Sequence, residues 1–283
     1  LILNPFMPQP RKRFAQHWLR SDKILNQIVK AAQLTPDDRV LEIGPGTGIL
    51  TRQLLPLARS VVSVEIDRDL CQSLVKKLGN IENFVLLEGD FLTLDLPKIV
   101  SPFSDIFQIQ NKVVANIPYN ITGPILEKLL GTISSPNSHL YESIVLLIQK
   151  EVADRVCAQP DSKAFGALSV RVQYLADCEL ICPVPAKAFY PPPKVESAVV
   201  RLRPRTIETP AKDPKFLDRI VRQGFSSKRK MLRNNLKNII DSDRLSEILT
   251  QLEIDPQIRA ENLSVANWVL LSDRLLEQPI HCS

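Results

Sequence analysis

The feature that most constrains the fold is an apolar run that leads directly into three closely spaced glycines. Residues 40–43 read Val-Leu-Glu-Ile, and Gly44, Gly46 and Gly48 follow before a helical pattern begins. A strand that ends in a glycine-rich turn and a helix is typical of parallel α/β sheets, where the turn lets a ligand approach the backbone. The dinucleotide-binding pattern needs its third glycine at position 49, which is Ile49 here. The turn therefore predicts a ligand site that differs from the dinucleotide type.

Short β-branched runs alternate with longer helical patterns through most of the chain. We expect helices at 23–33, 49–57, 68–78 and 123–130, and strands at 39–43, 61–64, 84–88, 112–115 and 143–148. Two further strand-like runs, 170–180 and 197–202, would close the sheet with a hairpin at one edge. The alternation predicts an α/β fold with a seven-stranded, mostly parallel sheet.

A proline-rich run at 203–214 separates this part from a segment whose patterns are all helical, at 216–225, 228–240, 244–252 and 264–277. We therefore expect two domains, residues 1–204 and 205–283. The helix expected at 228–240 would be capped by Ser226 or Ser227. It would bury a stripe of apolar residues and present cations on a neighbouring face; the stripe is Leu232, Leu236 and Ile239.

Acidic residues stand at the ends of the second and third expected strands. Glu65 can accept hydrogen bonds from both hydroxyls of a ribose, as an acid at this place does in nucleotide-binding sheets. Asp90 can bond the amino group of an adenine, and Phe91 can border the ring. Each acid alone is more often a solvated strand end, but three consecutive strands that end in suitable groups favour a nucleoside site.

The fourth expected strand ends in Asn116-Ile-Pro118-Tyr119. The amino nitrogen of adenine is a poor nucleophile because its lone pair is delocalised into the ring. An enzyme that alkylates it should accept the hydrogen bonds of that nitrogen and clamp the base by stacking. Asn116 offers an oxygen, Tyr119 a flat face, and Pro118 stiffens the turn that holds both. The segment resembles the Asn/Asp-Pro-Pro-Tyr loop of enzymes that methylate amino groups of nucleic acids, and the glycine turn resembles the first motif of class I S-adenosylmethionine (SAM) methyltransferases.

Charge, cysteines and hydropathy limit the class of protein. The net charge is +5, with one basic cluster near the start of the chain and six cations without an acid between residues 222 and 237. Both clusters are typical of a surface that binds phosphate. A solvated helix face and an unstructured terminus would produce the same pattern of charges. These cations are Arg11, Lys12, Arg13, Arg222, Lys228, Arg229, Lys230, Arg233 and Lys237.

Five scattered cysteines indicate a reducing compartment, and Cys178 with Cys182 has no second pair or nearby histidine to complete a zinc site. We expect no metal. Because no apolar run is long enough to span a bilayer and the opening residues do not fit a signal peptide, we expect a cytoplasmic protein without a membrane partner. A location in an organelle stroma or matrix is an alternative, because a transit peptide removed upstream would leave no trace in this sequence.

The chain resembles the KsgA/RsmA family of rRNA adenine dimethyltransferases from about residue 11 to residue 270. Besides the motifs above, the resemblance rests on five segments, residues 11–19, 150–155, 165–169, 189–197 and 223–236. It implies a Rossmann-like class I methyltransferase domain followed by a small all-helical domain that binds RNA. The implied activity is dimethylation, with SAM, of two adjacent adenosines in the 3′-terminal hairpin of 16S rRNA, late in assembly of the small ribosomal subunit.

The resemblance also implies roles for single residues. SAM would be contacted by His17, Leu19, Gly44, Gly46, Glu65, Asp90 and Asn116. Asn116, Pro118 and Tyr119 would form the catalytic loop. Phe189 would border the target base or only anchor the proline turn that follows it. The protein departs from the family at Ala15, Trp18 and Ser227, where glycine, phenylalanine and glutamine are usual, and the stretch 101–111 is longer than usual.

Two other functions stay open at this point. A large-subunit rRNA adenine methyltransferase would share the sheet and the catalytic loop, but its helical tail differs from residues 223–236. A noncatalytic RNA-binding assembly or transcription factor could keep the same fold, although the intact catalytic loop argues against it. We expect the protein to be monomeric, with the small subunit and its 16S rRNA as partners.

Overall fold

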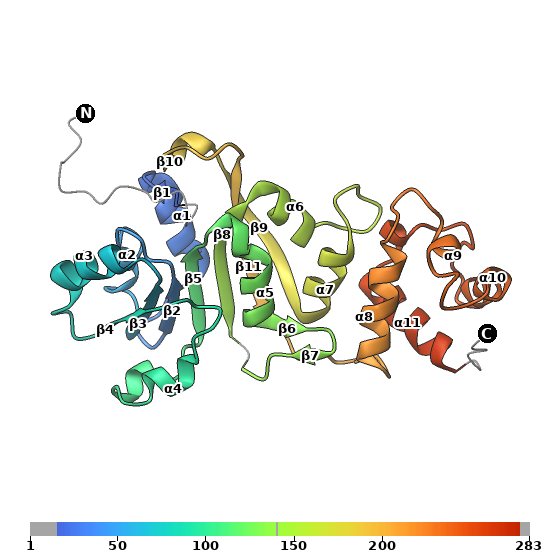
Figure 1. Ribbon diagram of the computed structural model, residues 1–283, viewed down its shortest axis with the longest axis horizontal. Coiled ribbons are helices and arrows are strands. Elements are labelled where there is room, and N and C mark those ends of the chain that lie inside the picture. Colours follow the sequence, from blue (N-terminus) through green and yellow to red (C-terminus); the bar gives the residue numbers. More distant parts are fainter. Residues whose placement is uncertain (1–15, 140, 278–283) are drawn as a thin grey trace. The chain divides into compact units, whose positions relative to one another are not determined.

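The computed structural model describes residues 16–139 and 141–277 (Figure 1). The chain forms two compact units. Unit 1 combines Leu1–Leu129, His139–Ala153 and Glu179–Pro204, and unit 2 combines Leu130–Ser138, Asp154–Cys178 and Arg205–Ser283. The boundary expected after residue 204 is thus one of several places where the chain passes from one unit to the other.

A seven-stranded sheet forms the centre of unit 1, in the spatial order β4-β3-β2-β5-β8-β11-β9 (Figure 1). The first five strands in this order are parallel to their neighbours, and β11 runs antiparallel to β8. The mostly parallel α/β sheet expected from the sequence is therefore confirmed. The strands are β2 (Arg39–Ile43), β3 (Ser60–Glu65), β4 (Phe84–Glu88), β5 (Lys112–Asn116), β8 (Ser143–Gln149), β9 (Ala176–Val184) and β11 (Ser197–Pro204).

Helices connect these strands, and three of them start at side-chain caps. The Ser21 hydroxyl accepts the Ile24 N–H ahead of α1, and the Asp67 carboxylate accepts the Asp69 N–H ahead of α3. The Asp95 carboxylate accepts the Lys98 N–H ahead of α4. The helices are α1 (Asp22–Ala32), α2 (Thr51–Leu54), α3 (Arg68–Leu78), α4 (Leu96–Val100), α5 (Thr122–Leu130) and α6 (Lys150–Val156). Short 3₁₀ turns are η2 (Asp105–Phe107), η3 (Tyr119–Ile121) and η4 (Ala186–Ala188).

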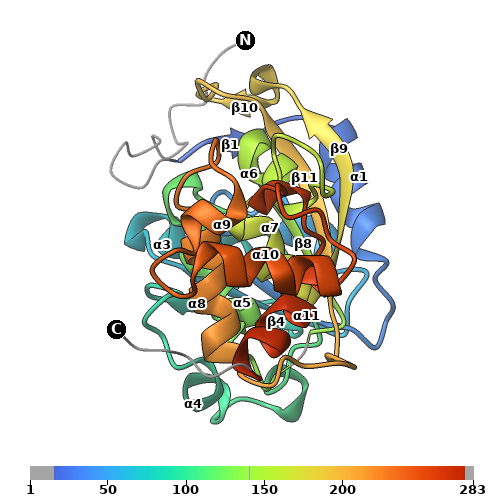
Figure 2. The same ribbon diagram turned by 90° about the vertical axis from the view of Figure 1, so that its right-hand side faces the viewer.

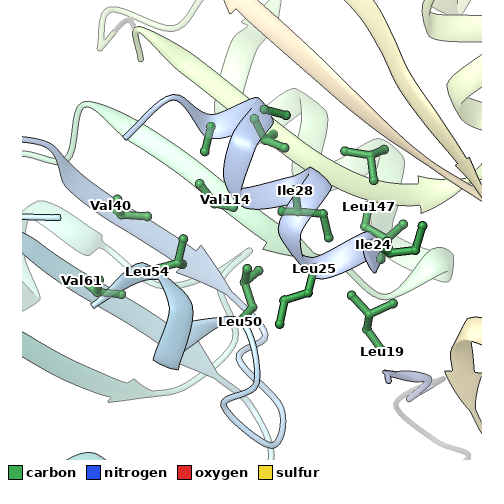
Figure 3. Close-up of a cluster of buried hydrophobic side chains, with 14 of the residues drawn as sticks. Leu19, Ile24, Leu25, Ile28, Val40, Leu50, Leu54, Val61, Val114 and Leu147 are labelled. Carbon is green, nitrogen blue, oxygen red and sulfur yellow. The ribbon is translucent and has the colours of Figure 1, made fainter. Parts of the chain in front are cut away.

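The core of unit 1 forms where α1 lies against the sheet. Figure 3 shows Leu25 and Ile28 of α1 beside Val114 of β5 and Leu147 of β8, and all four side chains are buried. The buried residues of α1 recur at helical spacing, so one face of the helix is apolar and covers the parallel strands. This packing fixes the sheet whose strand ends carry the candidate site.

Two small pairs of strands lie outside the main sheet. The strand β1 (Trp18–Leu19) pairs antiparallel with β10 (Phe189–Tyr190). In unit 2, β6 (Gly131–Thr132) pairs with β7 (Ser135–Pro136). The first pair matters for function, because it joins the start of the described chain to the proline-rich segment 189–193.

Unit 2 is built around helices packed on a buried tryptophan. Trp268 is fully buried and its ring lies 5.7 Å from that of Phe225. A Cβ atom on Gly224 would come within 2.4 Å of Trp268, so only glycine fits there. Figure 2 shows the C-terminal helices from orange to red. The elements are α7 (Ala167–Leu175), α8 (Pro214–Gly224), α9 (Leu232–Asn235), α10 (Ser242–Gln251), η5 (Ala260–Asn262) and α11 (Val265–Leu276).

The strand expected at 170–180 is wrong in its first half, because residues 167–175 form α7. The alternating sequence Val-Arg-Val-Gln-Tyr mimics a strand, yet Val170, Val172, Tyr174 and Leu175 are all buried in the helix. The Ser169 hydroxyl accepts the Gly166 N–H and donates to the Arg155 carbonyl, which holds the start of the helix. Tertiary packing therefore overrides the local β preference.

The helix expected at 228–240 is also wrong, since only Leu232–Asn235 are helical and the residue before them is Met231, not a serine cap. The buried Asn235 amide donates to the carbonyls of Gly224 and Ser227, so side chain and backbone form a compact loop instead. Leu232 and Leu236 are buried as expected, whereas Ile239 is half-buried.

No helix within the described residues is both long and apolar enough to cross a membrane.

Candidate active site

A cleft lies at the carboxyl ends of β2, β3, β4 and β5. Parallel strands end at the same edge of a sheet, which is where ligands bind in folds of this kind. The cleft, with its open mouth, measures about 1030 Å³. Its walls contain all the proposed cofactor-binding and catalytic residues: His17, Leu19, Gly44, Gly46, Glu65, Asp90, Asn116, Pro118 and Tyr119.

The glycine turn forms the floor of the cleft and adopts a backbone that favours glycine. Gly44, Gly46 and Gly48 have φ angles of +69°, +59° and +78°. A Cβ atom on Gly46 would stand 3.5 Å from Trp18, and one on Gly48 would stand 2.7 Å from Leu74. The turn therefore leaves its backbone open to a ligand and cannot carry ordinary side chains.

Two buried glutamates stand beside this turn. Glu65 accepts hydrogen bonds from the N–H groups of Gly46 and Asp67, each at 3.0 Å. Glu42 accepts the hydroxyls of Thr51 and Ser63, each at 2.7 Å. Burial raises the pKa of Glu65, and it raises the pKa of Glu42 to about 7 against the opposing effect of the two hydroxyls.

Two buried polar atoms of the residues that line the cleft have no hydrogen-bond partner within residues 16–139 and 141–277. They are Oε1 of Glu42 and Nε1 of Trp18. One is an acceptor and the other a donor, so they match a ligand that carries both an ammonium and a carboxylate. No feature of the sequence marked Trp18 as a ligand contact beyond its departure from the usual phenylalanine.

The loop after β4 presents Asp90 and Phe91 to the cleft. Oδ1 of Asp90 accepts the N–H of Leu92 at 2.9 Å, and the ring of Phe91 is buried. This arrangement agrees with the expectation that a carboxylate and an aromatic ring stand at the end of the third expected strand.

The fourth strand end carries the segment from Asn116 to Tyr119. Nδ2 of Asn116 donates to the carbonyl of His17 at 3.3 Å, which leaves Oδ1 of the same amide as an acceptor. The rings of Tyr119 and His17 are stacked, with centroids 5.8 Å apart and planes at 21°. The hydroxyl of Tyr119 lies 2.5 Å from Oγ of the fully buried Ser197, a contact that the sequence did not indicate.

The pairing of β1 with β10 positions His17 and Phe189. Nδ1 of His17 donates to the carbonyl of Pro191 at 2.7 Å, so the imidazole is fixed between that carbonyl and Tyr119. Phe189 is 4% exposed and belongs to the hydrophobic cluster with Leu19, not to the residues that line the cleft. This burial supports the alternative in which Phe189 anchors the proline turn.

The basic residues divide into two groups. Arg11, Lys12 and Arg13 lie outside the described residues. In unit 2, Lys228, Arg229, Lys230 and Lys237 are exposed, and Arg233 is half-buried. Nζ of Lys228 donates to the carbonyl of Lys163. Within the described part of the chain, no group of three or more His, Cys, Asp or Glu side chains could hold a metal ion.

A sequence model of one protein family, described as ribosomal RNA adenine dimethylase, matches residues 7–277. The chain belongs to this family. It is similar to two proteins named ribosomal RNA small subunit methyltransferase A. The one from Nostoc sp. is 66% identical over 269 residues, 95% of this chain and 99% of the relative, and the one from Picosynechococcus sp. is 60% identical over 271 residues, 96% and 99%.

Solved structures agree with the membership of this dimethylase family. A dimethyladenosine transferase from Plasmodium falciparum matches with a TM-score of 0.77 and 28% identity, over 94% of this chain and 99% of that one. The 23S rRNA methyltransferase ErmE matches with a TM-score of 0.70 and 28% identity, over 92% and 100%. The protein therefore has the class I methyltransferase fold, and it is an enzyme of the rRNA adenine dimethyltransferase type that uses SAM.

The residues of this dimethylase fit SAM. The amino acid end of SAM carries an ammonium, which can donate to Oε1 of Glu42. It also carries a carboxylate, which can accept from Nε1 of Trp18. Gly46 leaves its backbone open beside Glu65, and Asp90 stands at the next strand end. When bound, SAM supplies a methyl group that its sulfonium activates towards attack by a nucleophile.

Proposed function

We propose that this protein transfers two methyl groups to the 6-amino group of each of two adjacent adenosines in the 3′-terminal hairpin of 16S rRNA, late in assembly of the small subunit. The observation that carries this proposal is the position of Asn116 and Tyr119 in the same cleft as Glu65 and Asp90. The small-subunit names of the similar proteins from Nostoc sp. and Picosynechococcus sp. support the choice of RNA.

We assign the cofactor-binding roles to the strand ends. Glu65 accepts hydrogen bonds from the ribose hydroxyls, because its buried carboxylate already collects N–H donors at the mouth of the glycine turn. Asp90 accepts the adenine amino group. Gly44 and Gly46 let the ligand approach the backbone, and His17, Leu19 and Asn116 complete the wall on the side of β1.

The catalytic loop would act on the target amino group. Oδ1 of Asn116 and a carbonyl near Pro118 accept the two hydrogens of the nitrogen, and this geometry draws the lone pair out of the ring. The lone pair would then face the methyl group that bound SAM would supply, and the surplus proton of the amino group would leave to water. Positioning provides most of the rate, so no dedicated base is required.

Tyr119 would hold the extruded base by stacking. Its ring is fixed from two sides, by the imidazole of His17 and by the hydroxyl of Ser197. Burial raises the pKa of Tyr119, so the phenol keeps its proton at neutral pH. Stacking on a neutral aromatic ring stabilises a base that has left its helix.

RNA phosphate would be bound by the cations of unit 2, Lys228, Arg229, Lys230, Arg233 and Lys237, and by Arg11, Lys12 and Arg13. Four of the five in unit 2 are exposed, as phosphate contacts require. We further propose a monomer without a metal, located where ribosomes assemble, in the cytoplasm or in an organelle stroma or matrix.

The similarity to the 23S rRNA methyltransferase ErmE makes the large subunit a second candidate substrate. The sequence identity to ErmE is 28%, whereas the identities to the two small-subunit relatives are 60% and 66%. The test is mass spectrometry of both ribosomal RNAs from cells with and without the gene for this protein. We expect dimethyladenosine to disappear from 16S rRNA and 23S rRNA to stay unchanged. Loss from 23S rRNA would favour the second candidate, and no change in either RNA would favour a noncatalytic assembly factor.

A further inference from the structure

One lysine outside the set of predicted site residues holds the loop that follows Asp90. Lys128 lies on α5, and its Nζ donates to the carbonyls of Phe91, Leu92 and Leu94 at 2.5, 3.2 and 2.7 Å. An ammonium group has three protons and no acceptor site. Three carbonyls from one short loop therefore match its full capacity.

The same ammonium also contacts the aromatic ring of this loop. Nζ lies 4.9 Å from the centroid of Phe91, within the range of a cation–π interaction. Burial lowers the pKa of Lys128, and the charges of Asp90 and Asp95 oppose this shift. The two carboxylates thus help to keep the lysine charged where it contacts the loop.

A single peptide unit connects Lys128 to the carboxylate of Asp90. The carbonyl of Phe91 accepts from Nζ of Lys128, and the N–H of Leu92, in the same peptide plane, donates to Oδ1 of Asp90. Hydrogen bonds in such a chain strengthen one another. The position of Lys128 therefore sets both the orientation of the Asp90 carboxylate and the place of the Phe91 ring.

We propose that Lys128 is a positioning residue for the adenine end of SAM. It fixes the loop from which Asp90 recognises the adenine amino group, and this inference rests on the proposed role of Asp90. Because α5 follows the catalytic segment 116–121, Lys128 also ties the adenine-binding loop to the helix behind the reacting groups.

The experiment compares two ligands by calorimetry with the full chain. S-adenosylhomocysteine carries the adenine amino group, and S-inosylhomocysteine carries an oxo group in its place. In Lys128→Met we expect the preference for the amino compound to fall by on the order of 10-fold, about 1.4 kcal/mol. A merely structural role would weaken both ligands equally. The matched control is Lys98→Met, an exposed lysine on the neighbouring α4, which should keep the preference of the wild type.

The variant Asp90→Ala tests the role of Asp90 separately from that of Lys128. If Asp90→Ala keeps the preference for the amino compound, the assignment of Asp90 fails and the role of Lys128 fails with it. If Asp90→Ala loses the preference but Lys128→Met retains it, only the inference on Lys128 is overturned. Should Lys128→Met not fold, Lys128→Arg takes its place, because the planar guanidinium cannot direct three donors to the same carbonyls. An unchanged preference in that variant would overturn the inference equally.

Discussion

The side chains of the cleft are held by partners that act before any ligand binds. Asn116 is oriented by the carbonyl of His17, and Glu65 by two backbone N–H groups. Such groups need little rearrangement when charge or geometry changes in the reaction. Single substitutions should therefore separate binding from chemistry.

Asn116→Ala should nearly abolish methyl transfer while binding of SAM and of the small subunit stays close to that of the wild type. The oxygen of Asn116 matters most when the amino nitrogen turns pyramidal, so its loss raises the barrier more than it weakens the ground state. We expect a rate reduction on the order of 100-fold or more, by analogy with a lost transition-state hydrogen bond. Single-turnover methylation of unmethylated small subunits, beside a filter-binding assay, measures both quantities. Methylation at the wild-type rate would refute the role of this loop.

Glu42→Gln should change how stability depends on pH. The pKa of Glu42 is raised from 4.5 to about 7, so between these values the folded state binds more protons than the unfolded state. The free energy of unfolding from this group therefore falls as pH rises through that window and levels off above it. With about 1.36 kcal/mol per pKa unit, the effect is on the order of 3 kcal/mol. Urea unfolding at pH 5 and pH 8 should show a smaller fall in the variant. Parallel curves would contradict the shift.

At the scale of elements, contacts between distant segments decide how the loops are held. The strand β1 is fixed by β10, and the catalytic loop after β5 is fixed by Ser197 at the start of β11. Helices α8 and α11 meet where Gly224 faces Trp268. The last two of these contacts can each be tested by a small change in one side chain.

We expect Tyr119 and Ser197 to affect methylation through their shared hydrogen bond. Tyr119→Phe and Ser197→Ala each remove it while the stacking face remains, so both variants should slow methylation by a similar factor. The double variant should be no slower than the worse single one, because the shared bond is lost only once. Steady-state rates with thermal melting as a folding control provide the test. Additive losses would show that the two groups act separately.

Gly224→Ala should destabilise unit 2, because the new methyl group would stand 2.4 Å from the buried ring of Trp268. Overpacking of this kind costs about 1–3 kcal/mol. In differential scanning calorimetry we expect the unfolding transition of unit 2 to shift to lower temperature and that of unit 1 to stay in place, with SAM binding retained. The matched control is Gly123→Ala, where the added Cβ meets nothing within 4 Å and should leave both transitions in place. Unchanged melting of Gly224→Ala would contradict this account of the packing.

At the scale of the whole molecule, the net charge of +5 is modest and its distribution matters more. Three of the cations of unit 2, Lys228, Arg229 and Lys230, lie in an exposed turn that Asn235 holds by its bonds to Gly224 and Ser227. Sequence-independent binding to phosphate depends on such fixed charges and on salt.

Arg229→Gln with Lys230→Gln should weaken binding to the small subunit and reduce its salt dependence. Each lost phosphate contact removes about 0.7–0.9 from the slope of log K against log salt, so the double variant should lose about 1.4–1.8. Affinity for SAM should not change. The control, Lys76→Gln with Lys77→Gln on the exposed side of α3, removes equal charge from unit 1 and should keep the slope. A slope identical to that of the wild type in Arg229→Gln with Lys230→Gln would show that these two cations are solvated surface charges that do not contact phosphate.

The amino-acid sequence by itself determined where most strands of the parallel sheet lie along the chain, the glycine turn and the acids at the strand ends. These features are local, since a strand, its turn and its terminal acid lie within a few residues of one another. The bounds of β2 and α3 agree with those expected. The same locality let the segment from Asn116 to Tyr119 be placed beside Glu65 and Asp90.

Only the tertiary structure decided that residues 167–175 are helical, that residues 228–231 form a turn, and that Phe189 is buried. It also revealed the contacts of Lys128 with the loop after Asp90 and of Ser197 with Tyr119. The partners in these last two contacts are 37 and 78 residues apart, so no local pattern marks them. Packing and hydrogen bonding between distant segments outweigh the small local preferences, because burial of an apolar side chain or a satisfied polar group contributes more free energy than local propensity does.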